Sequence, residues 1–188
     1  MTHKIVLASK SPRRKEILEK AGYEFEIRVQ DADETLPCGI EPQKAVEILA
    51  EIKAKAVKRA KNELVIGADT VVVLDGVILG KPKDEKDAFL MLKGLSGKEH
   101  KVFTGVCIVT NEKTVTFSEE STVKFESLTE TQILEYIKTG EPMDKAGSYG
   151  IQGKASAFAK ITEGSFYNVM GLPIETLNKK LLEIEKIY

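Results

Sequence analysis

A run of small hydroxyl and basic residues follows the first apolar segment of the chain. The segment Ser9–Arg14 reads Ser-Lys-Ser-Pro-Arg-Arg, and Ser11 and Pro12 fit the N-cap and the first position of a helix. The free backbone N–H groups of a helix start, together with two hydroxyls and the cations of Arg13 and Arg14, favour a bound phosphate. The alternative is a capped helix with a solvated basic first turn, although cations there oppose the helix dipole.

Asp69 lies within one of the most apolar stretches of the chain, between residues 65–66 and 71–73. A carboxylate in such a strand is costly unless it is paired, bound to a metal or exposed at a cleft. It could hold a divalent cation, activate a water molecule or do both, and Glu34 could complete the cation site. The alternatives are a strand break at Gly67 with a local role for Asp69, and a solvated acidic loop around Glu34.

Two lysines lie where they could reach an anion. Lys53 borders the apolar stripe of a predicted helix rather than its solvent face, which a snorkelling lysine would explain equally well. Lys81 lies between Gly80 and Pro82 on a stiff turn, where an ordinary surface lysine is as compatible as a ligand. Neither lysine by itself indicates a phosphate site.

A second glycine-rich segment, Lys145–Lys154, lacks the spacing of dinucleotide and P-loop fingerprints. Its glycines could simply form turns. Gln152, however, lies between Ile151 and Gly153, where its amide could project into a pocket with little crowding. An amide offers both an acceptor and N–H donors, so it could pair with uracil or thymine.

The elements that position these residues follow a simple order along the chain. Strands and helices alternate early, and β-hairpins follow in the middle. The predicted strands cover residues 4–8, 24–29, 64–74, 77–79, 100–110, 114–126 and 155–162. The predicted helices cover residues 12–21, 84–93 (with Gly94 beyond the end), 129–138 and 173–186, and a long helix begins at Pro42 with an apolar stripe that reaches Ala56. Asp75-Gly76 predicts a hairpin turn, and Thr129–Gln132 predicts a capping box. The pattern favours an α/β protein with a mixed, elongated sheet flanked by helices.

Composition limits the classes of partner. The chain has 188 residues, 42% of them hydrophobic and 30% charged, which suits a soluble protein with one large domain or two packed lobes. A net charge of −1 argues against nucleic-acid or membrane partners, and no segment approaches transmembrane length. Cys38 and Cys107 lack metal-ligand spacing, which favours the cytoplasm, and His3 and His100 are too isolated for a zinc site.

Four motifs together resemble the Maf family of nucleoside triphosphate pyrophosphatases. They are Ser9–Arg14, Gly67–Val72, Gly80–Pro82 and Lys145–Gly153, and they occur in the family's order across almost the whole chain. The resemblance implies a single domain over residues 1–188, with two lobes around one cleft and the fold of inosine triphosphate pyrophosphatases. It also implies frequent homodimers.

The resemblance further implies hydrolysis between the α- and β-phosphates of a nucleotide, giving a monophosphate and pyrophosphate. Asp69 matches the family's proton acceptor, and Arg13, Thr70 and Gln152 match positions that tune base choice. The form Tyr149–Gln152 is similar to the subfamily that acts on dTTP and UTP, with CTP and modified pyrimidine nucleotides as further candidates. The related branch that prefers methylated GTP differs at the position of Gln152.

The residues agree with this implied reaction. A nucleoside triphosphate carries about four negative charges near pH 7, so its site needs several cations and a divalent metal. The candidate substrate-binding residues are Ser9, Ser11, Arg13, Arg14, Lys53, Thr70, Lys81 and Gln152. Mg²⁺ or Mn²⁺ prefers oxygen ligands, for which Asp69 and Glu34 are the best candidates.

Two other functions are compatible with parts of the pattern. The first is a nucleotide-binding regulator of cell division without essential turnover, against which the intact Asp69 counts. The second is a nucleic-acid-binding module based on Arg13 and Arg14, which the near-neutral charge and the lack of a basic or aromatic stripe disfavour. The sequence therefore favours an enzyme that removes pyrimidine nucleoside triphosphates from the nucleotide pool.

Overall fold

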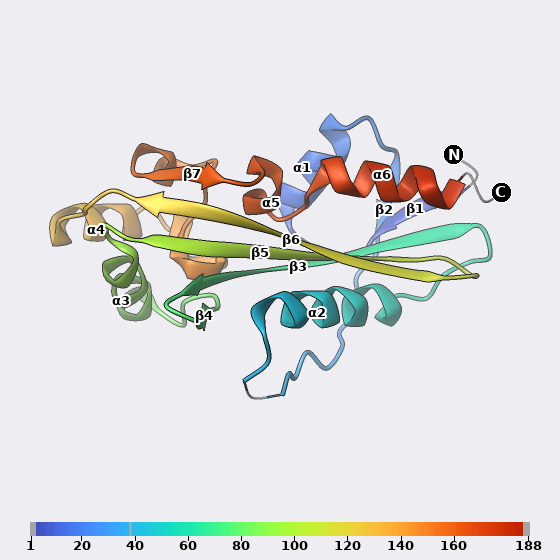
Figure 1. Cartoon of the computed structure of the whole chain (residues 1–188), viewed down its shortest axis with the longest axis horizontal. Coiled ribbons are helices and arrows are strands. Elements are labelled where there is room, and N and C mark those ends of the chain that lie inside the picture. Colours follow the sequence, from blue (N-terminus) through green and yellow to red (C-terminus); the bar gives the residue numbers. More distant parts are fainter. Residues whose placement is uncertain (1–2, 38, 186–188) are drawn as a thin grey trace. The chain divides into compact units, whose positions relative to one another are not determined.

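A computed structural model describes residues 3–37 and 39–185 and shows a mixed α/β fold (Figure 1). The strands are β1 (Lys4–Leu7), β2 (Phe25–Ile27), β3 (Glu63–Leu74), β4 (Val77–Leu79), β5 (Glu99–Val109), β6 (Thr114–Phe125) and β7 (Ala159–Glu163). The α-helices are α1 (Pro12–Lys20), α2 (Pro42–Ala56), α3 (Glu85–Leu95), α4 (Glu130–Ile137), α5 (Phe166–Met170) and α6 (Ile174–Glu185). Three 3-10 segments cover Glu141–Asp144, Ala146–Ser148 and Lys154–Ala157.

The strands form one sheet in the order β2-β1-β3-β5-β6-β7, with β4 paired to β3. Strand β1 runs parallel to both β2 and β3, whereas β4 is antiparallel to β3 and β7 is antiparallel to β6. The prediction of a mixed sheet flanked by helices is therefore confirmed. No helix in the described part of the chain is long and apolar enough to cross a membrane.

The structure departs from the predicted elements at two places. Gly94 lies inside α3 rather than beyond it, and residues 154–157 form a 3-10 segment, so that the last strand begins only at Ala159. The short helix α5 was not predicted. The strand predicted over residues 64–74 is confirmed, and the alternative of a strand break at Gly67 is excluded, because β3 continues through this residue.

The chain divides into two compact units. Unit 1 comprises Met1–Asp69, Thr104–Glu119 and Gly171–Tyr188, and unit 2 comprises Thr70–Phe103 and Glu120–Met170. Strands β3, β5 and β6 contribute residues to both units. The predicted cleft between two lobes stays a prediction.

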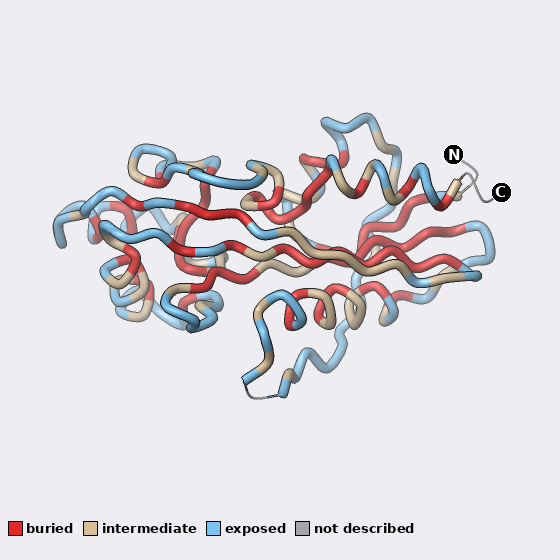
Figure 2. The backbone as a smooth tube through the Cα atoms, in the orientation of Figure 1, coloured by how far each residue is buried: buried red, intermediate tan, exposed pale blue. Residues whose placement is uncertain are grey.

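In unit 1, α2 covers one face of the strands, and α1 and α6 cover the other (Figure 1). A Cβ atom at Gly67 of β3 would lie 2.3 Å from the carbonyl oxygen of Ala50, and one at Gly105 of β5 would lie 2.3 Å from that of Val46. The glycines therefore let the backbone of α2 lie directly on the sheet. Figure 2 shows the buried residues concentrated on these strands and on the facing side of α2.

In unit 2, the hairpin turn and the helix cap that the sequence predicted are both present. Asp75 and Gly76 have φ angles of 50° and 81°, as the turn between β3 and β4 requires. Thr129 and Gln132 form a complete capping box at the start of α4. The aromatic rings of His100, Phe125 and Tyr149 form a buried cluster in this unit, with ring centroids 4.9–5.3 Å apart.

An ion pair fixes the start of β3 in unit 1. The guanidinium of Arg28 donates to both carboxylate oxygens of Glu63, at 2.9 Å and 3.1 Å. These hydrogen bonds, together with one from the backbone of Ala60, lower the pKa of Glu63 to about 2. The carboxylate is mostly buried, with 11% of its side chain exposed.

We expect Glu63→Gln to lower the midpoint of thermal unfolding at pH 7 by roughly 2–6 °C. Because the folded-state pKa of Glu63 is depressed, its contribution is complete above the unfolded pKa of 4.5 and is lost as the pH falls towards 2. The difference in unfolding midpoint between wild type and variant should therefore narrow as the pH falls from 4.5 towards 2. Glu26→Gln is the matched control, since Glu26 binds the same Arg28 with 61% of its side chain exposed, and an equal effect of both variants would contradict the prediction.

Candidate active site

The hydroxyl of Ser9 organises the start of α1. Ser9 is buried just after β1, and its Oγ accepts hydrogen bonds from the backbone N–H of Ser11 at 3.2 Å and from Nη1 of Arg14 at 3.1 Å. Ser11 is the N-cap residue, as predicted, but its own hydroxyl makes no capping bond. The first turn of α1 contains no acidic residue, so no carboxylate of that turn balances the helix dipole and its basic side chains.

Arg14 is held from two sides. Besides its bond to Ser9, its Nε donates to the carbonyl oxygen of Gly171 at 2.8 Å. Burial lowers the pKa of Arg14, the charge of Asp69 raises it, Arg13 lowers it and Glu34 raises it. The charges of two carboxylates and of a second guanidinium therefore act on Arg14. The guanidinium is thus a fixed cation beside an acidic group.

Lys53 links the two predicted carboxylates. It extends from α2, and its Nζ forms an ion pair with Asp69 of β3 and a second one, at 3.1 Å, with Glu34 of the loop between β2 and α2. The side chain of Lys53 is 22% exposed and that of Asp69 is 16% exposed. Lys53 therefore points at carboxylates rather than snorkelling to solvent, and Glu34 is more than a solvated loop residue.

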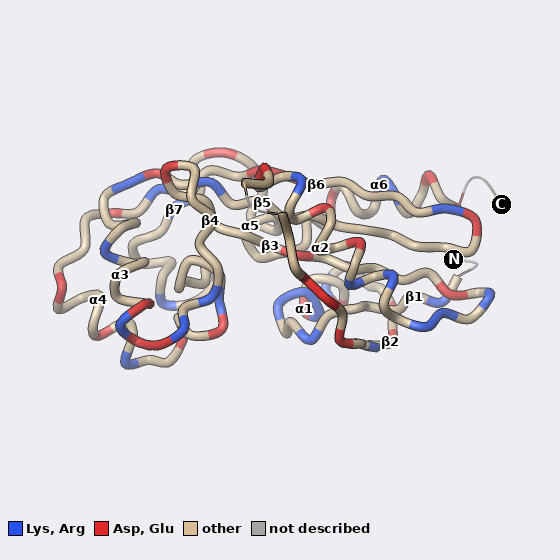
Figure 3. Tube along the Cα trace, turned by 90° about the horizontal axis from the view of Figure 1, so that it is seen from below, with Lys and Arg blue, Asp and Glu red and all other residues tan. Residues whose placement is uncertain are grey.

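The charged cluster of unit 1 comprises Arg13, Arg14, Glu34, Lys53 and Asp69. Basic residues crowd the first turns of α1, and acidic residues lie in the loop after β2 (Figure 3). The cluster thus brings together guanidinium and ammonium groups suited to phosphates and two carboxylates suited to a cation or to proton transfer.

The donor set of this cluster fits a magnesium-type cation. Within residues 3–37 and 39–185, no group of three or more His, Cys, Asp or Glu side chains could hold a metal ion. Mg²⁺, however, is usually bound by only one or two carboxylates, with water and substrate phosphates completing its shell. Asp69 and Glu34 already face one shared cation, the ammonium of Lys53. They are the residues that would hold such a metal.

The remaining predicted site residues belong to unit 2. Thr70 follows Asp69 on β3 and is half-buried, whereas Lys81 is exposed. The carbonyl oxygen of Gly80 accepts a hydrogen bond from the N–H of Gly147 at 3.0 Å, which joins the Gly80–Pro82 motif to the second glycine-rich segment. Gln152 is exposed on a turn rather than held in a pocket. Its amide is therefore open to solvent in this structure.

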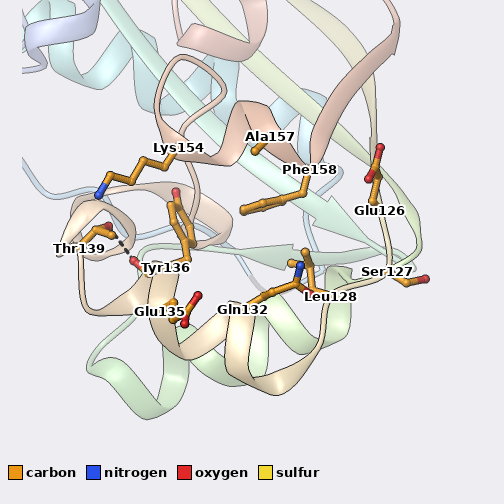
Figure 4. A pocket seen from close by; sticks show the side chains of 10 residues that line it. All are labelled: Glu126, Ser127, Leu128, Gln132, Glu135, Tyr136, Thr139, Lys154, Ala157 and Phe158. Atoms are coloured by element: carbon orange, nitrogen blue, oxygen red, sulfur yellow. Dashed lines mark hydrogen bonds between the residues drawn. The ribbon is translucent and has the colours of Figure 1, made fainter.

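A separate pocket lies in unit 2, between α4 and the chain before β7 (Figure 4). It has a volume of about 380 Å³. Its lining residues are Glu126, Ser127, Leu128, Gln132, Glu135, Tyr136, Thr139, Lys154, Ala157 and Phe158. None of the residues that the sequence pointed to for catalysis or substrate binding is among them.

Two contributors to the site geometry were not predicted from the sequence. The carbonyl oxygen of Gly171 positions Arg14 from 157 residues away in the chain, and the carboxylate of Glu141 contacts the segment that carries Gln152. Backbone carbonyls carry no residue-type signal. Glu141 follows Gly140 in a turn-rich stretch, where an acidic residue is ordinarily solvated.

Comparisons with known proteins give one consistent result. A family model described as "Maf-like protein" matches residues 4–184. A protein of Bacillus mycoides named dTTP/UTP pyrophosphatase is 51% identical over 183 residues, covering 97% of this chain and 96% of its own length. The protein of the same name from Bacillus cytotoxicus is 50% identical over 183 residues, with the same coverage.

Solved structures show a more distant similarity. The Ham1 protein of Staphylococcus aureus superimposes with a TM-score of 0.48 at 16% sequence identity, over 65% of this chain and 71% of that chain. A structure from Mycobacterium abscessus, described as a nucleoside-triphosphatase / dITP/XTP pyrophosphatase, gives a TM-score of 0.42 at 15% sequence identity. The match covers 66% of this chain and 75% of that chain.

Proposed function

The chain belongs to the Maf family, and on that premise we propose that it hydrolyses dTTP and UTP to the nucleoside monophosphate and pyrophosphate. The observation that carries the proposal is the charged cluster of unit 1, in which Arg14 and Lys53 lie beside Asp69. Similarity to relatives named dTTP/UTP pyrophosphatase over almost their full length supports the choice of substrate.

Asp69 acts as the general base in this proposal. It accepts a proton from the water whose oxygen attacks the α-phosphorus, the bond from that phosphorus to the bridging oxygen breaks, and pyrophosphate leaves. A bound Mg²⁺ or Mn²⁺, held by Asp69 and Glu34, would polarise the α-phosphate and make the water more acidic. No covalent intermediate is required.

The cations of the cluster bind the triphosphate. The planar guanidinium of Arg14 can bind two phosphate oxygens at once, and its bonds to Ser9 and Gly171 fix its orientation before substrate arrives. Arg13 and Lys53 add further positive charge. The hydroxyl of Ser11, which makes no capping bond, supplies a neutral donor.

Gln152 recognises the base in this proposal, with Thr70 as a second contributor and Lys81 as a further phosphate ligand. The amide of Gln152 can donate to O4 of thymine or uracil and accept from N3–H. The amide is exposed when no substrate is bound, and a base that pairs with it would cover it. A mismatched base would then leave a buried polar group unpaired, which costs about 1–3 kcal/mol.

Two properties of the molecule in the cell are part of the same proposal. A nucleotide-pool substrate places the enzyme in the cytoplasm, and the free, buried Cys107 agrees with a reducing compartment. Cys38, the other cysteine, lies outside the described residues. We further propose a homodimer.

Product analysis tests the reaction directly. The protein is incubated with dTTP, UTP, CTP, GTP and ATP in the presence of Mg²⁺, and the products are separated by anion-exchange chromatography. The expected products are a monophosphate and pyrophosphate, with activity lost in excess chelator. Release of orthophosphate and a nucleoside diphosphate would contradict attack at the α-phosphorus, and binding without turnover would favour the regulator.

We expect Gln152→Glu to weaken the preference for dTTP and UTP. A carboxylate cannot donate to O4, so kcat/KM for these two substrates should fall by about ten- to two-hundredfold relative to that for GTP. The matched control is Gln132→Glu, the same change at an exposed capping-box position that also accepts Glu. The model of amide recognition fails if the wild type prefers GTP or if Gln152→Glu keeps the wild-type ratios.

A further inference from the structure

The turn that carries Gln152 is closed by one backbone hydrogen bond. The N–H of Gly153 donates to the carbonyl oxygen of Gly150 at 2.9 Å. Ile151 is buried, with 8% of its surface exposed, and anchors the turn on one side. Gln152, on the other side, is exposed. The direction in which its amide points therefore depends on how the two ends of the turn are held.

A phenol and a carboxylate hold these two ends. At the first end, the N–H of Gly150 donates to the hydroxyl oxygen of Tyr136 at 3.3 Å. At the second end, the N–H of Lys154 donates to Oε2 of Glu141 at 3.0 Å. The hydroxyl of Tyr136 in turn donates to Oε1 of Glu141 at 2.8 Å. A single carboxylate thus connects both ends of the turn.

The turn lies so close to this carboxylate that a side chain at Gly153 would displace it. A Cβ atom at Gly153 would lie 2.2 Å from Oε1 and 2.5 Å from Oε2 of Glu141, and one at Gly150 would lie 2.7 Å from Cε of Lys145. The Nζ of Lys145 is itself bound to the backbone oxygen of Glu141 at 2.7 Å. Gly153 therefore permits close approach of the turn to the carboxylate of Glu141, and Gly150 permits close approach to Lys145, which binds Glu141.

Tyr136, which binds both Gly150 and Glu141, is anchored in a helix of unit 2. Tyr136 belongs to α4, is only 5% exposed and packs edge-on against Phe158, with ring centroids 5.3 Å apart. In Figure 4 its side chain extends from α4 towards the segment of Lys154. Burial and the bond to Glu141 raise the pKa of Tyr136, so the phenol remains a donor at neutral pH. A site residue supported in this way holds its geometry more closely than one on a free loop.

We propose that Glu141 is a positioning residue for base selection: its carboxylate holds the Gly150–Lys154 turn so that the amide of Gln152 meets a thymine or uracil ring. This inference rests on the proposed function. Glu141 itself touches no substrate and acts through Gln152. Its loss would let the turn shift, and discrimination by hydrogen bonds is lost when donors and acceptors no longer align.

The test compares Glu141→Ala with Glu141→Gln. We measure kcat/KM for dTTP and GTP and expect their ratio to fall by about tenfold in Glu141→Ala. Glu141→Gln should give an intermediate ratio, because its carbonyl can still accept from the N–H of Lys154. If the role of Glu141 is purely structural, the variant has a smaller folded fraction. This lowers kcat/KM for both substrates by the same factor and leaves their ratio unchanged. Glu135→Ala, at an exposed carboxylate on α4 next to Tyr136, is the control and should keep the wild-type ratio.

A double substitution tests the route through Gln152. In a Gln152→Ala background, Glu141→Ala should change the ratio no further, since the coupled residues share one effect. If Glu141→Ala does not fold, Glu141→Gln and Tyr136→Phe decide, and each should lower the ratio.

Wild-type ratios in the folded variants, or an undiminished second effect in the double variant, would overturn the role of Glu141. A wild-type protein without turnover, or without preference for dTTP, would instead overturn the proposed function.

Discussion

Asp69→Asn is expected to lower kcat by at least about a hundredfold, the loss that follows removal of a general base. The amide has the size of the carboxylate but cannot accept the proton of water and is a poorer metal ligand. The fold should persist, because Lys53 keeps its ion pair with Glu34. Steady-state kinetics with dTTP and Mg²⁺, together with a thermal unfolding curve, separate catalysis from stability.

Asp75→Asn provides the matched control for this substitution. Asp75 lies at the tip of the hairpin that β3 enters, with 72% of its side chain exposed, and pairs only with a surface lysine among the interactions described for it. Asn is also well accepted at the positive φ of this position. Turnover near the wild-type value in Asp69→Asn would remove Asp69 from the mechanism.

Arg14→Ala is expected to lower kcat/KM by about a hundredfold for every nucleoside triphosphate, as loss of a fixed donor to a reacting phosphate does. The loss should be common to all bases, because all carry the same triphosphate. Arg14→Lys should recover little of it, since an ammonium cannot reproduce the bonds to Ser9 and Gly171 and also bind two phosphate oxygens. The measurement is kcat/KM across the five nucleotides.

Lys15→Ala is the control, because Lys15 is the next residue on α1 and is half exposed and paired with Glu19. It should leave kcat/KM unchanged. Arg13→Ala should also weaken catalysis and, as the family resemblance implies, alter base preference. If the double substitution of Arg13 and Arg14 preserved both activity and nucleotide affinity, the basic first turn of α1 would be simply solvated.

Elements with local signals were predicted well. The hairpin turn at Asp75-Gly76 and the capping box of Thr129 are encoded within four residues, so no distant contact is needed to form them. The elements that were predicted wrongly depend on contacts with residues distant in the sequence. Gly94 continues α3 instead of ending it, at a position where an added Cβ atom would lie 3.6 Å from Leu74 of β3. Residues 154–157 form a 3-10 segment whose first N–H donates to Glu141.

The sequence by itself determined the chemical inventory of the site. It identified a carboxylate in an apolar strand, two arginines on a helix start and an amide between Ile151 and Gly153, because residue type and local periodicity are properties of the chain alone. It could not decide between a snorkelling and a pairing Lys53, since that choice depends on the packing of α2 on β3. Glycines 67 and 105 permit that packing, and it brings the ammonium to Asp69.

Only the tertiary structure decided which groups support the chemistry. It made Ser9 rather than Ser11 the acceptor for Arg14, placed the carbonyl of Gly171 on the same guanidinium, and set the carboxylate of Glu141 under the turn of Gln152. The physical reason is the same in each case. A hydrogen bond forms between whichever donor and acceptor the packed elements bring within about 3 Å, and for Arg14 and Gly171 that proximity joins residues that the sequence separates by 157 positions.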